Sequence, residues 1–133
     1  FTVSPVRHTK DGITENQLSK SKLICALHET LPHFENCHYL PIYEIMMDDL
    51  RDYRFYKEDL IHPNNQAIQY IWEKFGNAYF SEEVKDFITE NYKIKAALEH
   101  RPNDEKSPKY LEFLEKLKEK IALQQQKVKH KIF

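Results

Sequence analysis

The most informative stretch of this 133-residue chain lies near its middle and reads Lys57-Glu58-Asp59-Leu60-Ile61-His62-Pro63-Asn64. It places an aspartate three residues before a histidine, and a proline follows directly. With this spacing the Asp59 carboxylate can accept a hydrogen bond from one ring nitrogen of His62 and leave the other as a general base. This is half of a Ser-His-Asp triad, and no serine in the chain has the sequence context of a nucleophile.

The residues before this stretch predict a strand, a helix and a second strand. Residues 1–6 and 37–43 are short runs of β-forming residues, and the first of them stops at a proline, as a buried strand that ends in a loop does. Thr14-Glu15-Asn16-Gln17 fits a capping box at the start of the helix between them. This order predicts two parallel strands joined by a right-handed crossover. Residues 44–61 are expected to form a short helix and a loop that positions Asp59 and His62.

Three helices are predicted after the central stretch. Pro63 suits the first position of a helix, and Gly76 is its expected C-cap. Trp72 lies on the apolar stripe of this helix and is expected to be buried beneath the sheet with Ile68 and Phe75. Ser81 and Ser107 are expected to cap the next two helices. The last helix carries an apolar seam that Gln124 interrupts, formed by Tyr110, Leu114, Leu117, Ile121 and Val128.

Composition restricts the partners that the chain can have. The 20 basic and 21 acidic residues nearly balance, so neither a nucleic acid nor an anionic membrane is an expected partner. No apolar run approaches the roughly 20 residues that a membrane-spanning helix needs. Cys25 and Cys37 do not form a disulfide framework, which favours a reducing compartment such as the cytoplasm. Their spacing to the nearby histidines matches no common zinc site, so no metal and no cofactor are expected.

Three sequence words carry a family resemblance: Thr2-Val3-Ser4-Pro5-Val6-Arg7-His8, then Tyr43-Glu44-Ile45-Met46-Met47-Asp48-Asp49-Leu50-Arg51-Asp52-Tyr53-Arg54-Phe55-Tyr56, then Glu58-Asp59-Leu60-Ile61-His62-Pro63-Asn64. In this order they resemble the C-terminal part of SGNH hydrolases, and within that clan the GSCFA family. The resemblance covers about the first 76 residues. It implies an α/β fold, the C-terminal part of a flavodoxin-like α/β/α domain with few parallel strands over residues 1–76. Residues 77–133 would be a helical extension.

The resemblance also implies roles for individual residues. His62 would be the general base and Asp59 its orienting partner in a Ser-dependent hydrolase that acts on a small ester. The Gly-Ser-Cys-Phe-Ala word that names the family does not occur in the chain. The family's nucleophile and most oxyanion-hole donors would precede Phe1, so we expect this chain to be inactive by itself. His8 is a candidate substrate-binding residue, although a solvated loop histidine is the favoured interpretation of it.

A different class of function remains open. Asp59 and His62 are also common residue types at the start of a helix, where they would only cap it. The chain would then be a helical interaction module with an exposed apolar strip along Leu114, Leu117 and Ile121. Self-association through strand edges or the last helix is a further expectation. The cluster Arg51, Asp52 and Arg54 could line a pocket for an acidic substrate, but more often such a run is a set of local ion pairs.

Overall fold

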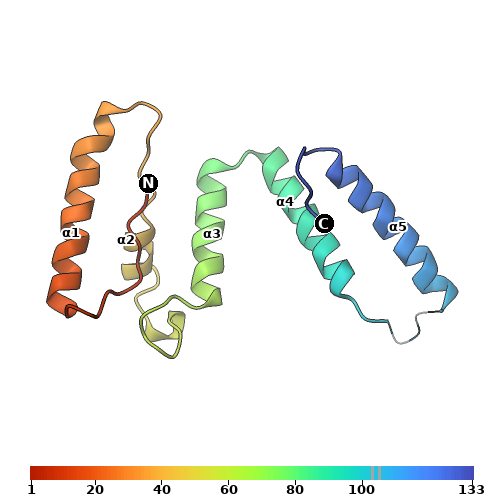
Figure 1. Cartoon of the computed structure of the whole chain (residues 1–133), viewed down its shortest axis with the longest axis horizontal. Helices are drawn as coiled ribbons and strands as arrows, with labels where there is room; N and C mark the ends of the chain where they lie inside the picture. The colour runs from red at the N-terminus through yellow and green to blue at the C-terminus, as the bar shows by residue number, and fades with distance from the viewer. Residues whose placement is uncertain (103, 105) are drawn as a thin grey trace. The chain divides into compact units, whose positions relative to one another are not determined.

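The computed structural model describes residues 1–102, 104 and 106–133 as a set of helices (Figure 1). The α-helices are α1 (Ile13–Thr30), α2 (Ile42–Met47), α3 (Asn65–Tyr79), α4 (Glu82–Glu99) and α5 (Pro108–Gln125), and η1 (Leu31–His33) and η2 (Tyr53–Phe55) are short 3-10 helices. The chain divides into two compact units, Phe1–Tyr79 and Phe80–Phe133. Within the described part, no helix is both long and apolar enough to cross a membrane.

The predicted α/β fold is wrong for this chain. Over the described residues there is no sheet, and the one bridge between extended residues is an isolated antiparallel pair of Tyr56 and Pro63. A helical first unit without parallel strands is not the C-terminal part of a flavodoxin-like domain. The strand edges through which we expected self-association are therefore missing from the described structure as well.

The two segments predicted as strands do lie side by side, but they pair over one residue only. The Phe1 amino group donates to the His38 carbonyl at 2.7 Å, and the Leu40 amide donates to the Phe1 carbonyl at 2.8 Å. Pro41 has no N–H to continue this pairing, and the chain enters α2 at the next residue. Pro5 removes a second donor on the other segment. Prolines in both segments explain why β-forming residues do not build a ladder here.

The predicted caps are observed at α4 and α5 but not at α1. Ser81 and Ser107 cap α4 and α5 as predicted, with their side chains accepting from the backbone N–H three residues on. α1 instead begins at Ile13 after Gly12, whose φ of 94° lies in the left-handed region that glycine tolerates. The predicted capping box at Thr14 therefore lies inside the helix.

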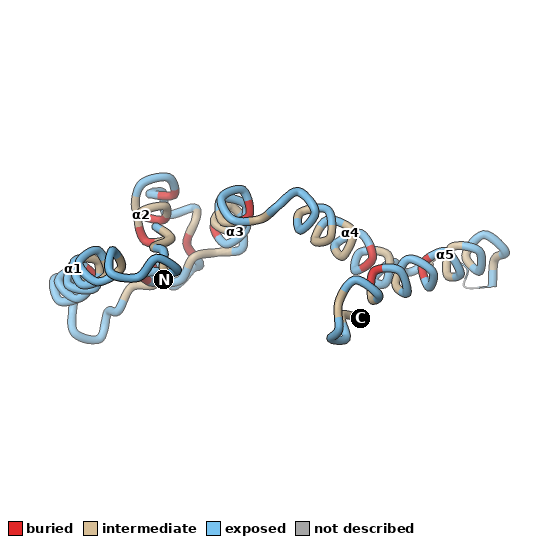
Figure 2. The backbone as a smooth tube through the Cα atoms, turned by 90° about the horizontal axis from the view of Figure 1, so that it is seen from above, coloured by how far each residue is buried: buried red, intermediate tan, exposed pale blue. Residues whose placement is uncertain are grey.

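The core of the first unit forms where α2 and α3 meet, and Figures 1 and 2 place α2 between α1 and α3. Met46, Leu50, Tyr56 and Ala67 are buried together there. Gly76 is buried inside α3 rather than ending it, so the predicted C-cap is wrong. Trp72 was also assigned to the wrong side of this helix: it is 40% exposed because the small residues of α3 face inward instead.

The second unit is a helix pair in which α4 packs against α5 (Figure 1). Ile94 and Leu117 are buried between the helices. Gln124 is buried too, and its amide donates to the Phe87 carbonyl at 2.8 Å and to Asn91 Oδ1 at 2.9 Å. The expected exposed strip is therefore wrong, because Leu117 lies in the core of this pair.

We predict that Met46→Ala destabilises the first unit by about 2–5 kcal/mol, because it leaves a cavity where no side-chain surface is exposed. Met47→Ala is the matched control: it removes the same atoms from a half-buried neighbour and should cost clearly less. Urea unfolding followed by circular dichroism measures both free energies. Equal losses for the two variants would show that Met46 is not the centre of this core.

Candidate functional site

The motif Asp59 to His62 forms a tight turn between η2 and α3. A backbone hydrogen bond closes the turn: the amide of Lys57, two residues before Asp59, donates to the His62 carbonyl at 2.8 Å. Leu60 lies at its tip with φ 56°, a left-handed conformation that is uncommon for a residue with a side chain. The turn therefore holds a strained residue in place, and other contacts must stabilise it.

Asp59 organises the turn with both carboxylate oxygens. Oδ1 accepts from the Ile61 amide at 2.9 Å and from the His62 amide at 3.0 Å. Oδ2 lies 2.7 Å from Nδ1 of the His62 ring. The two backbone amides, led by that of His62, and then the imidazole hold the pKa of the Asp59 carboxyl well below its usual range. Asp59 is therefore ionised throughout the neutral range.

This contact assigns the tautomer of His62. An ionised carboxylate accepts only, so Nδ1 must carry the proton and Nε2 of the neutral ring has the lone pair. The His62 side chain is 51% exposed, and among the described residues no hydrogen bond to Nε2 is present. The predicted contact between Asp59 and His62 is thus observed, and it leaves Nε2 with the lone pair.

The capping interpretation of Asp59 and His62 is wrong for α3. Asn64 caps this helix, since its Oδ1 accepts from the Ala67 amide at 3.1 Å and its carbonyl accepts from the Ile68 amide at 3.0 Å. Pro63 lies before the cap and pairs with Tyr56, so it is not the first residue of the helix. The carboxylate and the imidazole are consequently not used by the helix terminus.

Arg7 fastens the turn to the N-terminal segment. Its guanidinium donates to the Leu60 carbonyl at 2.6 Å, and its amide donates to the Ile61 carbonyl at 3.4 Å. The same guanidinium lies over the Tyr56 ring, 4.3 Å from the centroid. One side chain thus holds the strained residue from 53 positions away in the sequence.

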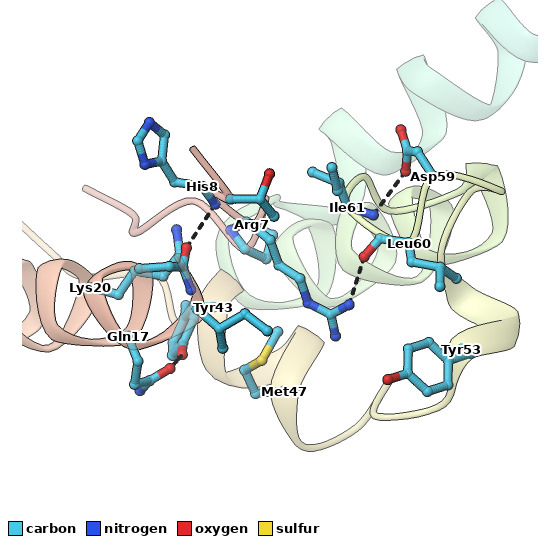
Figure 3. A pocket seen from close by; sticks show the side chains of 14 residues that line it. Arg7, His8, Gln17, Lys20, Tyr43, Met47, Tyr53, Asp59, Leu60 and Ile61 are labelled. Atoms are coloured by element: carbon cyan, nitrogen blue, oxygen red, sulfur yellow. Dashed lines mark hydrogen bonds between the residues drawn. The ribbon is translucent and has the colours of Figure 1, made fainter. Parts of the chain in front are cut away.

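A cavity of about 510 Å³ lies beside the turn, between α1, α2 and the N-terminal segment (Figure 3). Asp59, Leu60 and Ile61 line one part of it, while His62 stands outside the lining. His8 lines the cavity as well, with its backbone amide bound to Asn16 Oδ1 at 2.8 Å. Its ring is largely exposed and lies 3.4 Å from Asp11, so the structure is compatible with both interpretations of His8.

Lys20 is a cavity residue that the sequence analysis missed. It is only 8% exposed, and burial lowers the pKa of its ammonium group. Nζ donates to the Ser4 carbonyl at 2.6 Å and lies 5.8 Å from the centroid of the Tyr43 ring. The signal was its register: Lys20 lies four residues before Ile24 and seven before Leu27, so it shares one face of α1 with these apolar residues.

The other candidate residues are not brought to the site. Arg51 pairs with Asp48 at 3.3 Å on the exposed surface, and Asp52 accepts from the Arg54 amide at the start of η2. None of Arg51, Asp52 and Arg54 lines the cavity. Throughout the described ranges, no three His, Cys, Asp or Glu side chains are grouped as metal ligands, and Cys25 and Cys37 are free thiols.

Comparisons with known protein families identify the family to which this chain belongs. The model of the GSCFA family matches residues 1–75, more than half of the chain, and the chain belongs to that family. A second model, the C-terminal domain of GSCFA domain proteins, matches residues 92–132. The family resemblance of the first 76 residues is thereby confirmed, whereas the second match concerns a region in which the sequence analysis found no motif. No curated protein and no solved structure matches the chain.

We predict that His62→Ala raises the pKa of the Asp59 carboxyl only in part, because the two backbone amides remain its strongest partners. A lowered carboxyl pKa stabilises the folded turn fully above the unfolded value of about 3.9, and this contribution is lost as the pH falls through the folded pKa. Carboxyl ¹³C NMR titration of both proteins measures the shift. Titration of Asp59 near its unfolded value in the variant would show that the ring alone lowers its pKa.

Arg7→Ala should loosen the turn, because it removes a charged hydrogen bond to the strained Leu60. Such a loss predicts amide hydrogen exchange at Ile61 and His62 that is about tenfold faster or more. Arg51→Ala is the matched control, since it removes an exposed arginine from the same unit. Unchanged exchange in Arg7→Ala would mean that the turn is stable without this contact.

Proposed function

We propose that this chain supplies the acid–base half of a Ser-dependent ester hydrolase site, with His62 as general base and Asp59 as its orienting carboxylate. The observation that carries the proposal is the 2.7 Å contact between Asp59 Oδ2 and His62 Nδ1, with Nε2 left for a nucleophile. Membership of the GSCFA family supports it, since the matched residues include the whole Asp59 to His62 turn and the family resembles the SGNH hydrolases.

The reaction follows from this geometry as acyl transfer. Nε2 of His62 removes the hydroxyl proton of a serine as the oxygen attacks the ester carbonyl and forms a tetrahedral oxyanion. The oxyanion collapses, the bond to the leaving oxygen breaks, and His62 returns the proton to the departing alcohol. A water then attacks the acyl-enzyme with the same assistance and releases the acid. Asp59 stays ionised throughout and stabilises the imidazolium.

The nucleophile in this proposal comes from outside the chain. The Ser81 and Ser107 side chains cap helices. Ser19 and Ser21 lie in the body of α1, where Ser21 Oγ donates to the Gln17 carbonyl. Ser4 Oγ accepts from the Val6 amide, and Pro5 follows it without an N–H that an oxyanion hole could use. A serine within a Gly-Ser-Cys-Phe-Ala word, the motif that names the family, is the natural candidate.

We predict no saturable esterase turnover for the chain alone and no mass increase with a fluorophosphonate probe. Joined to a GSCFA-family N-terminal segment that carries this word, the chain should hydrolyse p-nitrophenyl butyrate. There, His62→Ala should lower kcat/KM by about a thousandfold or more. Asp59→Asn should lower it by orders of magnitude, because it favours the wrong tautomer.

His33→Ala is the matched control, since His33 is an exposed histidine of η1 that does not line the cavity, and it should leave turnover unchanged. Full activity of His62→Ala would contradict the assignment. Labelling of Ser4 in the chain alone would show that the nucleophile is not missing.

A further inference from the structure

The cavity beside the turn contains charged groups that the proposed acid–base chemistry does not use. Arg7 and Lys20 both line it, and in the described part of the chain neither forms an ion pair with a carboxylate. The carboxylate of the lining, Asp59, already binds two amides and an imidazole. Figure 3 shows Arg7 between the Lys20 side and the Asp59 side of the cavity in this view.

Lys20 is the unusual member of this set. The residue is buried, and a lysine that is drawn out of water costs free energy unless its charge is compensated, so buried lysines are rare. Nζ has three N–H donors and gives one to the Ser4 carbonyl. The Tyr43 ring offers partial compensation, and the Tyr43 hydroxyl is itself held by Gln17 at 2.8 Å. A ligand anion would supply the opposite charge that the protein does not provide.

The walls around Lys20 are mixed in character. Ile13 and Met47 give apolar surface, and Asn16 and Gln17 give polar groups from the same helix as Lys20. The volume of about 510 Å³ is within the usual range of small-molecule sites. A bare inorganic ion would leave the apolar part of this space unused.

We propose that this cavity binds a small organic anion, with its carboxylate at Lys20 and a short apolar chain against Ile13 and Met47. In the ester hydrolase proposed above, such a ligand would be a substrate whose acid or alcohol part carries the carboxylate. That assignment rests on the proposed function, whereas the binding itself does not. Lys20 would recognise the ligand, while Arg7 holds the turn and adds positive charge to the same cavity.

The experiment compares hexanoate, hexanamide and inorganic phosphate as probes of the intact chain. Backbone amide NMR titration follows the lining residues, among them His8, Asn16 and Leu60. We expect hexanoate to shift their signals saturably, and hexanamide and phosphate to bind at least about tenfold more weakly, because each lacks one of the two recognised features. Equal binding of hexanamide or of phosphate would overturn the proposal, and so would no binding of hexanoate.

Lys20→Met tests the residue directly, since it removes the charge and keeps most of the chain length. It should weaken hexanoate binding by about tenfold or more. Lys22→Met is the matched control on the same helix, where the lysine is exposed and outside the lining, and it should bind as the unchanged protein does. Equal weakening in both variants would mean non-specific attraction. If Lys20→Met fails to fold, the comparison of hexanoate with hexanamide in the unchanged protein still decides.

These measurements need no turnover. Failure of hexanoate to bind would leave the roles of Asp59 and His62 untouched. Conversely, an active His62→Ala variant would overturn the hydrolase proposal and leave the anion site standing.

Discussion

The hydrogen bond from Arg7 to the Leu60 carbonyl is the contact on which the site depends. Leu60 occupies a backbone conformation that costs free energy for a residue with a Cβ, and a charged donor at 2.6 Å offsets part of this cost. The same guanidinium stacks on Tyr56, which belongs to the buried core. The core, the N-terminal segment and the turn are therefore connected through one side chain. The contacts of Arg7 therefore position both the Asp59–His62 pair and the wall of the cavity.

The two oxygens of Asp59 bind different groups, and this explains why the spacing of three residues between Asp59 and His62 matters. A turn of this length brings the amides of Ile61 and His62 to one oxygen and the His62 ring to the other. The amides fix the carboxylate and lower its pKa even without the ring, so the imidazole meets a charge that is already in place. In the proposed mechanism, a carboxylate fixed in this way would need no reorganisation as the imidazolium forms.

The two units use buried polar groups in different ways. In the second unit the amide of Gln124 is satisfied by partners on α4, which makes it a structural contact of the helix pair. In the first unit Lys20 is buried with a carbonyl and an aromatic ring as its neighbours but with no carboxylate among the described residues. A satisfied buried group contributes to the fold, whereas a buried charge at the wall of a cavity is suited to a ligand.

Sequence alone determined what depends on local chemistry and on the family words. The Asp59–His62 contact, the caps at Ser81 and Ser107 and the membership of the GSCFA family all follow from short spacings that a few neighbouring residues satisfy. The catalytic roles of Asp59 and His62 remain a proposal, because they depend on a serine outside the chain.

Tertiary structure decided everything that needs a distant partner. Residues 1–6 and 37–43 have the composition of strands, but a strand exists only through a ladder, and Pro5 and Pro41 prevent one. Packing beside α2 turned Ala67 inward, where a small residue allows two helices to approach closely, and Trp72 stayed partly exposed. The register of Lys20 on α1 indicates its burial, but the cavity that it lines and the contact of Arg7 with Leu60 form only where segments far apart in the sequence meet.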